Sequence, residues 1–223
     1  GSYAHAVAAA DAAQPSPTRD FFLYRAMLEQ KDYAVVLAQI RDDHTPGVKA
    51  LKHLANYLLG NDTDKAIAAA KQDLADHQNG DDWMLLLACA NVLWQHAAST
   101  MAQEDFDAAL APIYQSTQLD VMALVASIYL TMNRPELARK QVDAMQNVDD
   151  DATLTRLTHA WVLIYEGKED AYKDALCEFQ ELAEKYSTST TLLNAMAVCN
   201  LHMARYAEAE SHLMDVLSRD RAD

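Results

Sequence analysis

Small and apolar side chains recur along this chain in pairs four positions apart, a spacing that places both side chains on one face of a helix. Seven such pairs occur: Ala6/Ala10, Val36/Ile40, Ala66/Ala70, Ala109/Ile113, Ala138/Val142, Ala175/Phe179 and Ala209/Leu213. Their leading residues lie 30, 30, 43, 29, 37 and 34 positions apart. A recurrence of this length is typical of stacked helical hairpins, because a single hairpin cannot bury its apolar face alone. The pattern therefore predicts an all-α solenoid of about six to seven hairpins.

Aromatic and alanine residues complete the predicted packing within each hairpin. In five of the pairs an aromatic residue precedes the first small residue by three positions: Tyr3, Tyr33, Phe106, Tyr172 and Tyr206. It lies one turn earlier on the same face, where it is expected to fill the turn between the two helices. Helices that approach to about 8–10 Å need small residues at the contact. In three first helices we expect Ala126, Ala160 and Ala197 to take that place.

Polar, glycine and proline segments separate the predicted helices. The helices are expected over residues 1–13, Phe21–Gln30, Tyr33–Arg41, Val48–Leu59, Asp64–His77, Trp83–Ala97, Phe106–Gln115, Leu119–Met132, Arg134–Met145, Thr153–Tyr165, Tyr172–Tyr186, Leu192–His202 and Tyr206–Arg219. Thr18 or Asp20 is the expected cap of the second helix, and a long link over Ser99–Asp105 is expected to cause the 43-residue interval. We predict one domain over residues 1–223. Because it starts inside a hairpin and no polar capping helix follows the last one, we expect a longer subunit that has been cut at both ends.

The charge balance and the cysteines narrow the classes of partner and compartment. Lysine and arginine number 18 against 33 aspartates and glutamates, a formal net charge of −15. No basic cluster is present, which argues against binding to nucleic acid and against direct binding to an anionic membrane. An acidic surface usually serves solubility, and the alternative is a basic partner. Cys89, Cys177 and Cys199 each lie in an apolar helical pattern and are expected to be buried thiols in a reducing cytosol.

The sequence contains no constellation for catalysis. It has no phosphate-binding glycine loop, no GxSxG and no HExxH. Asp149–Asp151 could bind calcium or magnesium, but EF-hand spacing is absent, so these carboxylates are expected to cap the next helix. Glu178 and Glu181 could form an acid–base pair, but we expect them to be solvated, and His159 to be a hydrogen-bonded structural residue. We predict a non-enzymatic protein with no metal site and no cofactor.

The hairpin pattern resembles tetratricopeptide repeats, most clearly in Leu192–Arg219. The segment Asp149–Val162 reads DDDATLTRLTHAWV, a run that repeat architecture alone does not require. Two further stretches are Phe21–Ala26 with Tyr33–Leu37, and Phe179–Lys185 with Leu192–Asn194. Together these segments are more closely similar to the epsilon subunits of coatomer, the COPI vesicle coat, in which the first run is close to DEDATLTQLATAWV.

This resemblance implies a coat component that docks on the C-terminal domain of the alpha subunit of coatomer and assembles with the other coat subunits. It implies a strongly curved or ring-like array that grips a segment of that partner and stabilises the coat in retrograde Golgi-to-endoplasmic-reticulum and intra-Golgi transport. The implied location is cytoplasmic, peripheral on Golgi membranes and COPI-coated vesicles, with only indirect membrane contact.

Exposed aromatic and amide side chains on the first helices of the hairpins are the expected anchors for such a partner. The candidate partner-binding residues are Arg25, Trp94, Tyr129, Trp161, Tyr165 and Asn194. For Trp94 and Trp161 the alternative is a place in the core. For Arg25 and Asn194 it is a buried structural hydrogen bond.

A second function stays open at this point, that of a generic tetratricopeptide-type adaptor or co-chaperone that captures peptide tails. Such proteins hold a terminal carboxylate with Lys, Arg and Asn side chains. The first helices of the last two hairpins carry little positive charge beyond Arg156, which disfavours this alternative.

Overall fold

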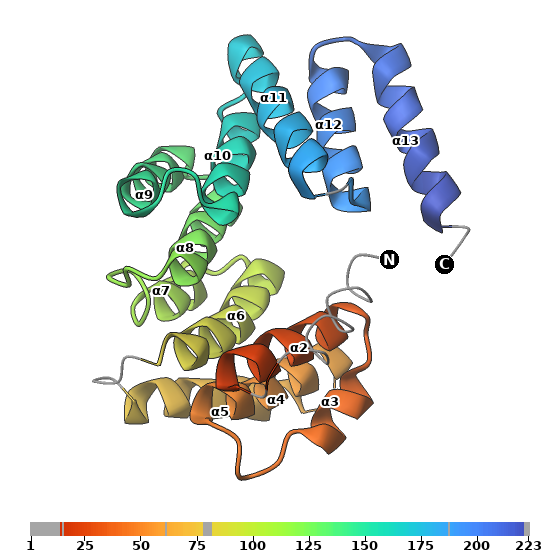
Figure 1. Ribbon diagram of the computed structural model, residues 1–223. Coiled ribbons are helices and arrows are strands. Elements are labelled where there is room, and N and C mark those ends of the chain that lie inside the picture. Colours follow the sequence, from red (N-terminus) through yellow and green to blue (C-terminus); the bar gives the residue numbers. More distant parts are fainter. Residues whose placement is uncertain (1–13, 15, 61, 78–81, 187, 221–223) are drawn as a thin grey trace. The chain divides into compact units, whose positions relative to one another are not determined.

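The structure is a computed structural model that describes residues 14, 16–60, 62–77, 82–186 and 188–220 (Figure 1). Among these residues the chain forms helices joined by short turns, and no strand occurs. The helices are α2 (Pro17–Glu29), α3 (Tyr33–Gln39), α4 (Pro46–Leu59), α5 (Thr63–Asp76), α6 (Trp83–Thr100), α7 (Gln103–Leu110), α8 (Leu119–Thr131), α9 (Pro135–Val148), α10 (Thr153–Glu166), α11 (Glu169–Tyr186), α12 (Thr190–His202) and α13 (Tyr206–Asp220). The predicted all-α class is confirmed. The helix expected over residues 1–13, with Tyr3 and the pair Ala6/Ala10, lies outside the described residues.

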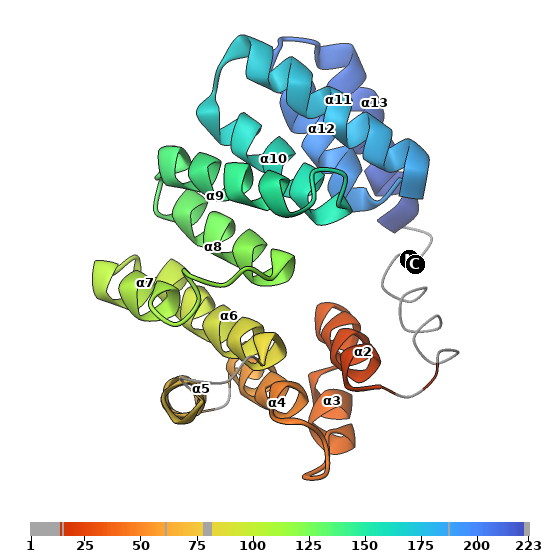
Figure 2. The same ribbon diagram turned by 60° about the vertical axis from the view of Figure 1, so that its left-hand side comes forward.

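The helices group into two compact units. We call Gly1–Ile128 the N-terminal unit and Tyr129–Asp223 the C-terminal unit, and the boundary between them falls inside α8. Each unit is built from consecutive helices that pack on one another, as the hairpin pattern predicts (Figure 2). The single, strongly curved or ring-like domain stays a prediction.

In the N-terminal unit, α4 and α6 form the centre of the packing. Helix α4 packs against α2, α3, α5 and α6, and α6 also packs against α5 and α7. A helix that is apolar nearly all round is expected to be buried among neighbours, and α6 fits this expectation. Its buried side chains are Leu85, Leu87, Ala88, Cys89, Ala90, Val92, Leu93 and Ala97.

A glycine and an aspartate join the first turns of α4 and α6. Asp82, the N-cap of α6, accepts hydrogen bonds through Oδ1 from the backbone N–H groups of Met84 and Leu85, at 3.1 and 3.2 Å. Its Oδ2 accepts a further bond from the backbone N–H of Gly47 at 3.1 Å. The absent side chain of Gly47 lets the two helix starts approach so closely, because a Cβ there would lie 2.5 Å from the Cβ of Met84.

In the C-terminal unit, each helix from α9 to α13 packs on the next. The larger core cluster takes residues from four helices, among them Leu163 of α10, Phe179 of α11, Met196 of α12 and Val216 of α13. A smaller cluster joins α9 to α10 through Val142 and its neighbours. The unit is therefore a continuous array in which α11 lies between α10 and α12.

The paired small residues are core residues, as predicted, with one exception. Every described member of the seven pairs is buried except Leu213, which is 40% exposed. The alanines expected in the first helices, Ala126, Ala160 and Ala197, are also buried. Leu213 lies on α13, which packs chiefly on α12, so no other helix of the described C-terminal unit covers the face of α13 that carries Leu213.

The aromatic residues before the pairs follow the prediction only in part. Phe106 and Tyr172 are buried, and Tyr33 is half-buried. Tyr206 is 66% exposed, so the prediction that it fills its turn is wrong. It shares the uncovered face of α13 with Leu213, because residues seven apart return to the same side of a helix.

Several predicted boundaries are wrong. The helix expected over Phe106–Gln115 is α7, which begins three residues earlier and ends five residues earlier, at Leu110. The long link over Ser99–Asp105 is in fact two residues, because α6 continues to Thr100 and α7 begins at Gln103. Met101, with φ 55°, makes that tight turn. The cap of α2 is neither Thr18 nor Asp20: the hydroxyl of Ser16 accepts the hydrogen bond from the N–H of Arg19 at 3.1 Å.

Candidate partner-binding surfaces

The six predicted partner-binding residues divide between the two units. Arg25 of α2 and Trp94 of α6 lie in the N-terminal unit and are half-buried. The Arg25 guanidinium lies over the ring of Phe21, 5.9 Å from its centroid. In the C-terminal unit, Tyr129 of α8 packs against the smaller core cluster. These three side chains are part of the packing of their own units, and a role for them in partner binding stays a prediction.

Trp161 and Tyr165 occupy successive turns of α10 but have different surroundings. Trp161 packs against both core clusters, and its ring meets that of Phe179 edge-on with centroids 5.4 Å apart. It is therefore largely a core residue, which was the alternative interpretation. Tyr165 is 51% exposed and is available to a partner.

Asn194 is exposed on α12 rather than held in a buried hydrogen bond. Val198 and Leu201, four and seven residues later, are exposed as well, and this spacing places all three on one face of the helix. We call these three residues the α12 row. Sequence reasoning missed the two apolar members because α12 is apolar around most of its circumference, so periodicity does not distinguish its exposed face from its buried one.

Arg156 of α10 is held by two carboxylates of α11. Its Nε donates to Glu178 Oε2 at 2.8 Å, and its Nη2 donates to Glu181 Oε2 at 2.6 Å. His159 lies beside them, with Nδ1 3.8 Å from Glu178 Oε1, which is longer than a hydrogen bond. Glu178 and Glu181 are thus neither an acid–base pair nor merely solvated. Because both carboxylates occupy Arg156, the adaptor alternative loses the cation that the sequence offered for a peptide carboxylate.

The contact between Arg156 and Glu181 predicts a change in the pKa of Glu181 that can be measured. The hydrogen bond from Arg156 holds the pKa of Glu181 below its usual range. Glu181 therefore contributes stability above its unfolded-state pKa of about 4.3 and loses it as the pH falls through the lower folded-state pKa. In an Arg156→Gln variant we expect the pKa of Glu181 to rise to its ordinary range, as followed by carbon NMR of the side-chain carboxyl. Lys173→Gln, which removes a cation bound to other carboxylates of α11, should leave that pKa unchanged.

The three cysteines are free thiols in different surroundings. Cys89 and Cys199 are buried, as predicted, but Cys177 is exposed, and its Sγ donates to Glu181 Oε1 at 3.7 Å. The buried face of α11 includes Leu176 and Phe179, and Cys177 lies off that face. Burial raises the pKa of Cys89 to about 12 and that of Cys199 to about 11. The pKa of Cys177 is also raised, first by desolvation and then by the Glu181 charge.

These surroundings predict that one thiol per folded chain reacts with a thiol reagent such as 5,5′-dithiobis(2-nitrobenzoic acid) at pH 8. We expect Cys177 to react more slowly than a free cysteine, because the thiolate is the reactive form. Cys89 and Cys199 should react only after unfolding. The control is Cys177→Ser, in which the folded chain should take up no reagent; rapid labelling of this variant would contradict the assignment.

The acidic segment before α10 does not cap the helix. The N-cap is Ala152, which has no side-chain capping bond. The Asp149 carboxylate instead accepts a hydrogen bond from the N–H of Asp151 at 3.1 Å, within the turn. In the described part of the chain, no group of three or more His, Cys, Asp or Glu residues could hold a metal ion. None of the described helices is long and apolar enough to cross a lipid bilayer.

The fold and these surfaces define a tetratricopeptide-like helical scaffold with exposed apolar side chains. A tetratricopeptide repeat protein from Parabacteroides merdae has a similar fold, with a TM-score of 0.58 and 14% identity over 97% of this chain and 79% of that one. This likeness confirms the predicted repeat fold.

Sequence comparison gives the family. The family model described as coatomer epsilon subunit matches residues 1–223. Coatomer subunit epsilon-1 of Oryza sativa subsp. japonica is 34% identical over 211 residues, which cover 95% of this chain and 70% of the relative. Coatomer subunit epsilon-2 of Arabidopsis thaliana is 31% identical over 228 residues, which cover 100% of this chain and 75% of the relative. The chain belongs to the coatomer epsilon subunit family, a family of structural components of the COPI coat, as the sequence resemblance indicated.

Proposed function

We propose that this chain binds the C-terminal domain of the alpha subunit of coatomer and stabilises the coat in retrograde Golgi-to-endoplasmic-reticulum and intra-Golgi transport. The observation that carries the proposal is the family match over residues 1–223. The proposed place of action is the cytoplasmic face of Golgi membranes and COPI-coated vesicles, with membrane contact through other coatomer subunits. The role is non-enzymatic.

Within the chain we assign this interface to the C-terminal unit, at Tyr165 and the α12 row. Exposed aromatic and aliphatic side chains with a neighbouring amide are the composition from which binding hot spots are built. Tyr165 and the α12 row lie on helices that pack around the same core cluster, so the scaffold beneath them is rigid. Trp161 supports this surface from within, through its contact with Phe179.

Co-purification with the C-terminal domain of the alpha subunit, followed by size exclusion in high salt, tests the proposal. We expect a one-to-one complex that survives high salt, because an apolar interface is little screened by salt. Leu201→Asp is expected to weaken the complex by at least about tenfold, since it buries a charge in the interface. Asn194→Ala and Tyr165→Ala should weaken it less.

The matched control is Leu59→Asp. Leu59 is 43% exposed at the end of α4, against 46% for Leu201, so both variants place the same charge on an equally exposed helix position. Leu59→Asp should leave the complex intact. If the two folded proteins form no complex, the proposed binding to the alpha subunit is wrong. A complex that tolerates all three substitutions in the C-terminal unit would keep the partner and move the interface elsewhere.

A further inference from the structure

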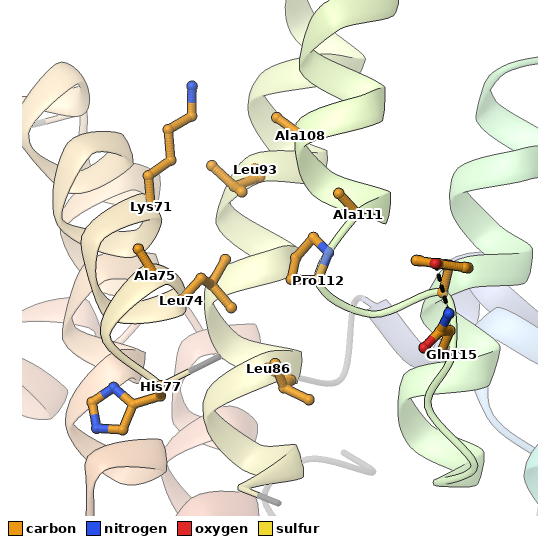
Figure 3. A pocket seen from close by; sticks show the side chains of 11 residues that line it. Lys71, Leu74, Ala75, His77, Leu86, Leu93, Ala108, Ala111, Pro112 and Gln115 are labelled. Atoms are coloured by element: carbon orange, nitrogen blue, oxygen red, sulfur yellow. Dashed lines mark hydrogen bonds between the residues drawn. The ribbon is translucent and has the colours of Figure 1, made fainter. Parts of the chain in front are cut away.

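A groove opens in the N-terminal unit, whereas the surface assigned above belongs to the C-terminal unit (Figure 3). Helix α5 forms one wall, the end of α7 and the turn after it form the other, and α6 lies at the bottom. Leu86 and Leu93 of α6 form its floor, and Leu74 of α5 and Pro112 contribute to the walls. Its volume is about 530 Å³, within the range of sites that bind ligands or partner side chains.

The groove exists because α7 is too short to cover α6. Helix α6 has 18 residues and α7 only eight, so their lengths are about 27 and 12 Å. Pro112 follows the end of α7 at Leu110, and proline in a helix interior clashes with the carbonyl four residues earlier. The chain therefore turns away over Ala111–Gln115, and the first half of α6 keeps Leu86 half-exposed.

Among the described residues that line the groove, Lys71 carries the one formal charge. Among the eleven residues that line it in the described chain there is no carboxylate, although the whole sequence contains 33. Lys71 stands at one end, near Leu93, and His77 at the other, near Leu86 (Figure 3). The Nδ1 atom of His77 bonds to the carbonyl of Asp73 at 2.9 Å, which leaves Nε2 as the ring nitrogen for a ligand.

Two carboxylates of the wall helices, Asp73 and Asp107, are engaged in hydrogen bonds of their own. Asp73 of α5 bonds to His53 Nε2 of α4 at 2.9 Å, on the side of α5 that packs on α4. Asp107 of α7 accepts a bond from the Gln103 side chain at 2.9 Å. A groove with a mixed polar and apolar lining, and with the Lys71 cation at one end, thus interrupts the surface of a strongly acidic chain.

We propose that this groove binds a short amphipathic acidic segment of a partner protein. The apolar side chains of the segment pack on Leu86, Ala111 and Pro112, because Leu93 is only 3% exposed at the floor, and a carboxylate of the segment pairs with Lys71. This is the helix-in-groove mode of recognition, with anchors at i, i+3 or i+4, and i+7. A second copy of the chain is a poor occupant, because each copy carries a net charge of −15.

Fluorescence anisotropy with three labelled synthetic helical peptides tests the proposal. Each peptide carries leucines at one spacing (i and i+3, i and i+4, or i, i+4 and i+7) and glutamates at its other positions. We expect at least one to bind at about 0.15 M salt. Ala111→Trp, which fills the groove from an exposed position, should weaken binding by at least about tenfold. Lys71→Glu should weaken it by about threefold, as expected for reversing one exposed ion pair.

Two controls make the result specific. Lys140→Glu, at an exposed position of α9, changes the net charge by the same amount as Lys71→Glu and should leave binding unchanged. Versions of the peptides with lysine in place of glutamate should bind the Ala111→Trp variant and the unchanged chain equally. The proposal is overturned if no acidic peptide binds, or if binding ignores both groove variants while circular dichroism reports a native fold. It is also overturned if light scattering finds a dimer that Ala111→Trp dissociates.

Discussion

Replacing Phe179 with alanine is expected to lower the free energy of unfolding by about 3–5 kcal/mol, the range for truncating a buried phenylalanine. The Phe179 side chain is fully buried in α11, and its ring packs edge-on against that of Trp161. Because α10, α11 and α12 all contribute to this cluster, the truncation leaves a cavity that no single helix can close. Urea unfolding followed by circular dichroism measures the change.

The same helix supplies the control for this substitution. Tyr186, the last residue of α11, is 52% exposed, so Tyr186→Ala removes an aromatic ring without opening a core cavity. We expect a loss below about 1 kcal/mol for this variant. Equal losses for the two variants would mean that the cluster around Phe179 is not the stabilising core of the C-terminal unit.

Replacing Gly47 with alanine is expected to destabilise the N-terminal unit by about 2–3 kcal/mol. In an ordinary helix the same change stabilises by about 0.5–1 kcal/mol, because glycine loses more conformational entropy on folding. Here the new Cβ would lie 2.5 Å from the Cβ of Met84 and 2.9 Å from the backbone nitrogen of Leu85. Neither atom is the flexible end of a side chain, so α4 and α6 must separate and strain the Gly47–Asp82 hydrogen bond.

Gly60→Ala separates this packing effect from backbone strain. Gly60 ends α4 with φ 77°, and a Cβ there would meet nothing within 4 Å. The substitution Gly60→Ala should therefore lower the free energy of unfolding only by the cost of the left-handed backbone conformation, about 1–2 kcal/mol. Thermal or urea unfolding should therefore show that the Gly47→Ala variant is less stable than the Gly60→Ala variant, although the backbone at Gly47 is not in the left-handed region. A stabilised Gly47→Ala variant would contradict the close approach of the two helices.

The pairs of small residues predicted the core of the described hairpins correctly, except at Leu213, because burial and helical period are local properties. Two side chains four positions apart share a face in any helix, and an apolar pair is stable only when that face is covered. The prediction failed at Leu213 for the same reason. Periodicity identifies a face suited to burial, whereas a neighbouring helix must be present to cover it.

The boundaries and caps show a second limit. The link after α6 was predicted over Ser99–Asp105 from its polar composition, but Ser99 and Thr100 continue the helix. The Ser99 hydroxyl donates to the carbonyl of His96, three residues earlier, at 2.7 Å, and the Thr100 hydroxyl donates to Asp105 Oδ2 of α7 at 2.7 Å. Such side-chain bonds let polar residues extend the helix where composition predicts a loop.

The candidate surfaces were predictable only in part. Tyr165 and Asn194 are exposed, as a binding role requires. Val198 and Leu201, which share a face of α12 with Asn194, were missed because they resemble core residues in sequence. In sequence, Arg156 is the main positive charge on the first helices of the last two hairpins. The structure, however, places it between Glu178 and Glu181. That pairing joins residues more than twenty positions apart, so no local pattern could reveal it.

The sequence by itself determined the helical hairpins, their order, most of their buried faces and, through the Asp149–Val162 segment, the family. These follow from periodicity, small residues and a distinctive run of side chains, which act within one helix or between adjacent ones. Only the tertiary structure decided which apolar faces stay exposed, which carboxylates hold Arg156, and where an eight-residue α7 leaves α6 uncovered. Each of these depends on where the neighbouring helix ends and how closely it approaches, because burial and ion pairing are set by contacts between helices rather than by residue type.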